Sequence, residues 1–235
     1  MKQSASFYRD ILYPFQDGIL NIVRQLNTPF YLTGGTALGR HYFNHRFSDD
    51  LDLFVNSEPN YSRHVAQILN ALEENQKQFN FAIDYRRLRK EEHYTQIFLT
   101  QLENAADLKL DLINDIAAHY GELEHSKTMG RIDSWRNILS NKLAAVFRYE
   151  AKDFADIWII AKHKPIAWRE IISEAKTKEA GIDPLALQEI LRSFPPDEVM
   201  AVKWNIPIDE NNFIADLATI ADDILQGKEN SLFCA

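Results

Sequence analysis

The sequence predicts an α+β protein, in which an α/β part with a mixed sheet precedes a helical part. Two observations support this fold class. Strand-like and helix-like patterns alternate up to about residue 128, and from Ser134 onward only helical spacing remains. We therefore expect one domain over residues 1–128 and a second over residues 129–235. An apolar content of 46% is enough for a proper core.

The first part is expected to contain three helices and five strands. Apolar residues recur at helical spacing from Phe15 to Leu26, before Asn27 and Pro29 end the helix. Leu108, Leu110 and Leu112 alternate with charged residues, as in a strand that buries one face, so Asp111 is expected to point away from the core. The expected helices are 15–26, 36–43 and 61–76, and the expected strands are 30–32, 51–55, 79–85, 94–100 and 107–113.

The second part is expected to contain five helices. Asp183 followed by Pro184 is typical of a helix start, with an N-cap and a proline at the first helical position. Asp153 and Asp156 resemble a capping box, which predicts that a helix begins at Asp153. The expected helices are 135–148, 153–162, 166–176, 184–194 and 211–225.

Composition narrows the classes of function. A net charge of −8 argues against a surface that coats nucleic acid non-specifically, although basic clusters occur near Arg40 and at 86–90. No apolar run of about 18 residues occurs, so we expect a cytoplasmic protein that does not enter a membrane. The single cysteine, Cys234, excludes an internal disulfide framework and a cysteine metal cluster. Any metal must be held by Asp, Glu or His.

Three aspartates are the candidate metal ligands. Asp50 and Asp52 lie one residue apart at the start of an expected strand, so their side chains share a face. Asp111, on another strand, would complete a clamp for one or two Mg²⁺ or Mn²⁺ ions, as phosphoryl transfer requires. Each aspartate taken alone has a simpler interpretation. Asp50 and Asp52 could be solvent-exposed residues at the start of a strand, and Asp111 could be an exposed strand residue.

A glycine pair precedes these carboxylates. Gly34 and Gly35 end a strand and open a helix, which allows close backbone approach to phosphate oxygens, and Thr36 adds a hydroxyl donor. An ordinary strand-to-helix turn is the alternative. Arg46 and Ser48 either orient the carboxylates and touch phosphates or satisfy loop polar groups. The order of strand, glycine turn, helix and Asp-x-Asp favours the phosphate interpretation.

Lys142 is the candidate catalytic cation. It lies on the expected helix after Trp135, and its ammonium is a point charge suited to a triphosphate or a leaving pyrophosphate. The alternative is a network of charges spaced four residues apart on a solvated helix face.

Two blocks of the sequence resemble the AbiEii/AbiGii toxin family of nucleotidyltransferases, which have the DNA polymerase β-like fold. These are residues 31–38, with Gly-Gly-Thr-Ala-Leu at 34–38, and residues 46–54, with Arg-Phe-Ser-Asp-Asp-Leu-Asp-Leu-Phe. Residues 110–113 match the third acidic position of that family more loosely. Residues 139–156 are similar to its helical Lys and Asp motif, and the similarity spans about residues 15–160.

The resemblance implies an enzyme that transfers a nucleotide from a nucleoside triphosphate (NTP), with a helical domain that contributes to the active-site cleft. It also implies tRNA 3′ ends as the acceptor, a toxin role and a separate antitoxin partner. Residue by residue, it gives Asp156 a place in nucleotide binding. The expected catalytic residues are Asp50, Asp52, Asp111 and Lys142, and the expected nucleotide-binding residues are Gly34, Gly35, Thr36, Arg46, Ser48 and Asp156.

Two alternatives stay open at this point. Transfer to a small cationic molecule such as an aminoglycoside uses the same carboxylates and suits the acidic net charge. A catalytically silent nucleotide-binding module is the second alternative, against which the retention of all three carboxylates counts. An RNA acceptor would instead need a local basic surface, for which the sequence offers Arg40, Arg46 and the cluster Arg86, Arg87, Arg89 and Lys90.

Overall fold

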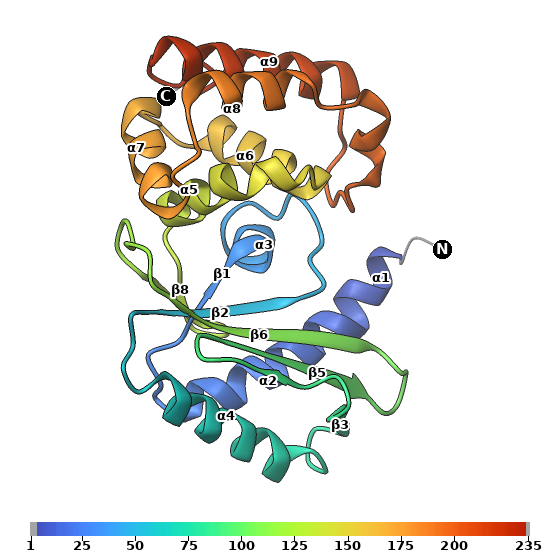
Figure 1. Ribbon diagram of the computed structural model, residues 1–235. Helices are drawn as coiled ribbons and strands as arrows, with labels where there is room; N and C mark the ends of the chain where they lie inside the picture. The colour runs from blue at the N-terminus through green and yellow to red at the C-terminus, as the bar shows by residue number, and fades with distance from the viewer. Residues whose placement is uncertain (1–3, 234–235) are drawn as a thin grey trace. The chain divides into compact units, whose positions relative to one another are not determined.

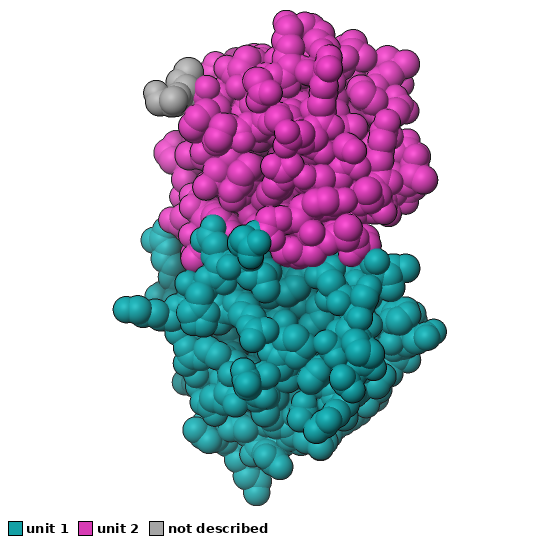
Figure 2. Space-filling model, turned by 90° about the vertical axis from the view of Figure 1, so that its left-hand side faces the viewer, with its two compact units in different colours: residues 1–37, 47–116, 122–133 teal, residues 38–46, 117–121, 134–235 magenta. Residues whose placement is uncertain are grey.

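The computed structural model describes residues 4–233, and these form two compact units (Figure 2). Unit 1 comprises the chain up to Ala37 together with Phe47–Ile116 and Glu122–Asp133. Unit 2 comprises Leu38–Arg46, Ala117–Gly121 and the chain from Ser134 onward. Cys234, which bears on the disulfide prediction, lies outside the described residues.

Unit 1 is built on a mixed sheet with the strand order β3-β5-β6-β2-β1-β8-β7, in which β4 pairs with β5 (Figure 1). The β2–β6 and β1–β8 pairs are parallel and the other pairs are antiparallel. The predicted mixed sheet is thus confirmed. The strands are β1 (Tyr31–Thr33), β2 (Leu51–Asn56), β3 (Phe81–Ile83), β4 (Arg89–Lys90), β5 (Tyr94–Gln101), β6 (Asp107–Asp115), β7 (Glu124–Ser126) and β8 (Gly130–Ile132).

Two long helices, α2 (Tyr13–Gln25) and α4 (Tyr61–Asn75), cover one face of this sheet (Figure 1). The alternate residues of β2 and β6 supply its core face, because side chains along a strand point to opposite sides. The Tyr61 hydroxyl of α4 donates to the carbonyl oxygen of Leu112 at 2.8 Å, which fixes that helix on the sheet. The shorter helices of unit 1 are α1 (Ala5–Phe7), the π-helical η1 (Tyr8–Leu12) and α3 (Gly34–Ala37).

Unit 2 is helical, as predicted for the second half of the chain. Its core contains an aromatic cluster, in which the ring centroid of Phe213 lies 5.3 Å from Trp158 and 5.7 Å from Phe194. Trp158 is thus a core residue. The helices are α5 (Trp135–Ala145), α6 (Ala151–His163), α7 (Trp168–Lys178), α8 (Pro184–Arg192) and α9 (Glu210–Gln226), with the shorter η2 (Leu38–Tyr42), η3 (Val146–Arg148) and η4 (Pro196–Ala201).

Two helix starts were predicted from capping residues in unit 2, of which one is confirmed and the other is wrong. Asp183 caps α8, since its carboxylate accepts from the backbone N–H groups of Leu185 and Ala186. The predicted start at Asp153 is wrong, because α6 begins at Ala151 after an extended Glu150. Asp153 lies inside the first turn and is fully buried. Ion pairs with Lys142 and Arg148, described below, hold it there in place of a capping role.

No helix among residues 4–233 combines the length and the apolar character needed to cross a bilayer.

Candidate active site

The register between β2 and β6 brings two of the predicted carboxylates together. Asp52 and Asp111 are directly paired in these parallel strands, and Leu51 is paired with Leu110. Paired residues project from the same face of a sheet, so both carboxylates lie opposite the leucine core. Asp50 comes just before β2 and joins them through a shared contact with Lys109. The sheet therefore gathers all three predicted aspartates on one face of unit 1.

Asp111 is held by three donors. Its Oδ1 accepts from the Tyr94 hydroxyl and from Gln96 Nε2, each at 3.1 Å, and its Oδ2 accepts from Lys109 Nζ at 2.9 Å. The residue points away from the leucine core, as predicted, yet these neighbours leave it only 7% exposed. Burial raises the pKa of Tyr94 to about 12, and the adjacent Asp111 adds to the effect. Tyr94 therefore keeps its proton at neutral pH and serves as a fixed donor.

Lys109, like Tyr94 and Gln96, is a residue of this site that was not predicted from the sequence. Its Nζ lies 3.1 Å from Asp50 Oδ2 and 2.9 Å from Asp111 Oδ2. Burial acts to lower the pKa of Lys109, but Asp111 and Asp50 raise it overall, so the ammonium stays charged. The signal was present in the sequence, because a residue two positions before Asp111 on a strand must share its face.

The three aspartates offer the kind of donor atom that a divalent cation binds, which is a carboxylate oxygen. Within the range 4–233, no three His, Cys, Asp or Glu side chains converge closely enough to hold a metal ion together. Asp50 and Asp111 instead converge on an ammonium group, so a positive charge already occupies the space between them. Carboxylate oxygens from neighbouring strands are the ligands that Mg²⁺ and Mn²⁺ prefer. Asp50, Asp52 and Asp111 are the residues that would hold the ion.

Gly34 lies directly against Asp52. β1 ends at Thr33, which pairs with Asp52, and Gly34 follows with a φ of +65°. A Cβ atom at Gly34 would lie only 2.8 Å from Asp52 Oδ2. Both the backbone conformation and the close approach therefore require glycine. The predicted glycine turn and the Asp-x-Asp pair are parts of one local structure.

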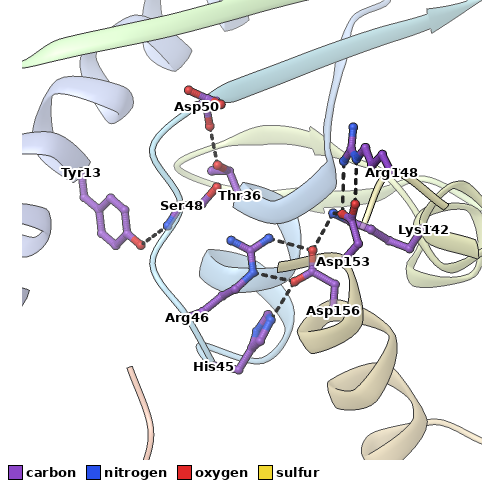
Figure 3. Close-up of polar contacts among 10 residues, drawn as sticks. All are labelled: Tyr13, Thr36, His45, Arg46, Ser48, Asp50, Lys142, Arg148, Asp153 and Asp156. Carbon is purple, nitrogen blue, oxygen red and sulfur yellow. Dashed lines mark hydrogen bonds and ion pairs between the residues drawn. The ribbon is translucent and has the colours of Figure 1, made fainter. Parts of the chain in front are cut away.

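Thr36 and Ser48 take part in hydrogen bonds that hold the segment leading into β2. Thr36 is fully buried, and its hydroxyl donates to the carbonyl oxygen of Asp50 (Figure 3). The backbone N–H of Ser48 donates to the Tyr13 hydroxyl at 3.4 Å, and Gln16 Nε2 donates to the Ser48 carbonyl at 3.2 Å. These contacts fix the segment that leads into Asp50. Gly35, also buried, follows Gly34 in α3.

Three further predicted site residues, Arg46, Lys142 and Asp156, meet in unit 2 (Figure 3). Arg46 donates to both carboxylate oxygens of Asp156, each at 2.7 Å, and Lys142 Nζ lies 2.6 Å from Oδ2. His45 Nε2 lies 2.9 Å from Oδ1. Burial acts to raise the pKa of Asp156, but Arg46 and Lys142 hold it well below its usual value. Asp156 is thus a fully buried carboxylate with three partners.

Lys142 links Asp156 to a second buried carboxylate. Its Nζ lies 2.7 Å from Asp153 Oδ1, and Arg148 Nε lies 2.8 Å from Asp153 Oδ2. Lys142 is 7% exposed, and the two aspartates raise its pKa against the effect of burial. Arg46 is 5% exposed, so it adds no charge to a basic surface. These contacts form an ion network that holds residues 38–46 to α5 and α6. A direct contact of Arg46, Lys142 or Asp156 with a nucleotide stays a prediction.

His45 is the titratable member of this network. Burial lowers its pKa, and the opposing contact with Asp156 does not reverse that shift. Its Nδ1 is buried and has no hydrogen-bond partner in the described part of the chain. Protonation would create a buried N–H without an acceptor, which is unfavourable. Neutral His45 with a proton on Nε2 is therefore the form that fits this site.

A mixed sheet with paired strand carboxylates behind a glycine turn, followed by helices, is the architecture of a nucleotidyltransferase. The family model for the nucleotidyl transferase AbiEii toxin of type IV toxin–antitoxin systems matches residues 20–222. The chain belongs to this AbiEii family, which confirms the resemblance seen in the sequence.

Two solved structures share the fold. JHP933 from Helicobacter pylori is 20% identical, with a TM-score of 0.61 over 96% of this chain and 94% of that chain. A candidate nucleotidyltransferase from H. pylori is 19% identical, with a TM-score of 0.59 over 95% of this chain and 96% of that chain. No curated protein matches the sequence.

We predict that Gly34→Ala lowers the free energy of unfolding by about 1–3 kcal/mol, because it combines a left-handed backbone with a contact against Asp52. Urea unfolding measures the loss. Gly181→Ala is the matched control, since its Cβ would meet only Glu179 Oε1 at an ordinary 3.6 Å. Equal losses in the two variants would contradict the close approach at Asp52.

We predict that the parent protein loses stability between pH 7 and pH 5 more steeply than His45→Gln. The pKa of His45 is lowered in the folded state, so its contribution is fully present above the unfolded value of 6.5 and is lost as the pH falls below it. Glutamine keeps a donor and cannot titrate. The difference in slope should approach about 1.4 kcal/mol per pH unit for one proton. Parallel urea-unfolding profiles for the two proteins would contradict this role of His45.

Proposed function

We propose that the protein transfers a nucleotide from an NTP to an acceptor hydroxyl, with a divalent metal held by Asp50, Asp52 and Asp111. The observation that carries the proposal is the pairing of Asp52 with Asp111 on adjacent parallel strands, with Asp50 on the same face. Membership of the AbiEii family supports this activity. The acceptor hydroxyl would lose its proton to water, its oxygen would bond to the α-phosphorus, and the bond from that phosphorus to pyrophosphate would break.

Each part of the carboxylate face has a distinct task in this reaction. Mg²⁺ or Mn²⁺ would neutralise the phosphates and activate the acceptor hydroxyl. Asp50 and Asp52 hold the nucleotide side of the site, and the absence of a side chain at Gly34 lets the backbone lie directly against Asp52. Asp111 serves the acceptor side, where Tyr94 and Gln96 fix its Oδ1 and leave little freedom to the carboxylate. Such fixed positioning supplies much of the catalysis in phosphoryl transfer.

We propose an RNA end, in particular a tRNA 3′ end, as the acceptor and a separate antitoxin as the partner. The family is one of toxins from toxin–antitoxin systems, which supports the partner. A basic segment of unit 1, residues 86–90, supports the acceptor, because Arg89 and Lys90 are exposed on β4 and Arg86 has 91% of its side chain exposed. Arg86 pairs with Asp84, its Nε lying 3.1 Å from Oδ1, and the guanidinium of Arg87 lies 3.5 Å from the centre of the Phe98 ring. Arg87 is therefore partly engaged in packing against Phe98.

The activity is tested by incubating the protein with each α-labelled NTP, Mg²⁺ and a total tRNA pool. We expect Asp52→Asn and Asp111→Asn each to slow transfer by a factor of about 100 or more, because several kcal/mol of charge stabilisation are lost. Asp107→Asn is the matched control on the same strand, since Asp107 has 57% of its side chain exposed. Transfer at the parent rate by either site variant would refute the assignment of the carboxylates.

The acceptor is tested by reversing the charge of three exposed cations, Arg86, Arg89 and Lys90, to Glu. Transfer to RNA should fall by about tenfold or more while NTP affinity stays unchanged, because phosphate contacts are lost. Reversal of Lys77, Lys127 and Arg131, which are also exposed, gives the same change in net charge as a control. Undiminished RNA labelling, or labelling of an aminoglycoside and no RNA, would favour the small-molecule acceptor, which added negative charge attracts.

A further inference from the structure

Lys109 occupies the place where a bound cation would meet the carboxylate face. It lies two residues before Asp111 on β6, so the two side chains share a face. Its single ammonium group touches Asp50 Oδ2 at 3.1 Å and Asp111 Oδ2 at 2.9 Å. The Lys109 side chain is 28% exposed and that of Asp111 is 9% exposed, so water screens this contact only in part. The site therefore contains its own counter-ion.

The ammonium and a metal ion compete for the same oxygen atoms. A divalent ion coordinates carboxylate oxygens at about 2.0–2.1 Å for Mg²⁺, which excludes a second cation from those lone pairs. Without any cation, Asp50 and Asp111 would face each other as like charges across a few ångströms. Lys109 removes that repulsion, and it also opposes entry of a metal ion by charge.

We propose that Lys109 is an internal counter-cation, which holds the carboxylates in place and must be displaced before a metal ion binds between Asp50 and Asp111. This inference rests on the proposed function, because it concerns the same carboxylates. The displaced ammonium of Lys109 needs another negative charge, which the triphosphate of the nucleotide supplies. Binding of the metal ion therefore depends on the nucleotide. Lys109 is thus a positioning residue that couples the two binding steps.

The test is the affinity of the full chain for Mn²⁺ without nucleotide, measured by calorimetric titration. Lys109→Met should bind Mn²⁺ roughly tenfold more tightly than the parent, since a competing charge at contact distance is gone. Lys77→Met, at an exposed lysine after α4, removes the same charge elsewhere and should bind Mn²⁺ as the parent does. Lys109→Gln also removes the charge while keeping an amide donor for the carboxylates, so it gives the answer if the Met variant fails to fold.

A second measurement separates competition from a merely structural role. A non-hydrolysable NTP analogue should tighten Mn²⁺ binding more in the parent than in Lys109→Gln, because the variant has no ammonium to displace. In the absence of metal, Lys109→Gln should unfold at a lower temperature than the parent, and Mn²⁺ should restore more of its stability.

An unchanged or weakened Mn²⁺ affinity in both Lys109 variants overturns the inference. Equal effects of the analogue in parent and variant overturn it as well. The proposed function fails in a different way, when the parent transfers no nucleotide to any acceptor even though Lys109→Gln binds Mn²⁺ more tightly.

Discussion

The parallel register between β2 and β6 is the constraint on which the carboxylate face depends. A slip of one residue would turn Asp111 to the side of the core and Leu110 to the side of the site. Leu108, Leu110 and Leu112 are completely buried, so such a slip would expose all three. The packing of the leucines thus determines where the carboxylate points. In this sheet, hydrophobic burial and the geometry of the site are specified by the same residues.

A buried negative charge organises unit 2 in a comparable way. Asp156 has no exposed surface, and a charge in that position is tolerated only when it is paired. Its partners Arg46 and Lys142 come from segments far apart in the chain, so the carboxylate joins residues 38–46 to α5 and α6. Removing one partner of a buried pair commonly costs about 3–5 kcal/mol. The basic residues of the chain therefore divide into buried structural cations, such as Arg46, and exposed ones, such as Arg86.

The parts of the structure that follow from local patterns could be predicted from the sequence. Alternation along 107–113 gave both the strand and the face of Asp111, and the Asp183 and Pro184 pair gave the start of α8. The strands β4, β7 and β8 are as short as β1 and β3, but each contains at most one apolar residue, so no apolar run marks them in the sequence. The local pattern of a capping box at Asp153 was overridden by a tertiary contact with Lys142. Nothing in the sequence near Arg46 indicates a partner 110 residues away.

The chain passes between the two units five times, since residues 38–46 and 117–121 belong to the helical unit although both their neighbouring segments belong to the sheet unit. Neither unit is therefore a contiguous stretch of sequence. A gene fragment ending at residue 133 would encode His45 and Arg46 without the carboxylate that they bind. Exchange of the helical unit by recombination would require three separate segments to move together. For this reason the sheet and the helices are expected to diversify in step rather than as independent modules.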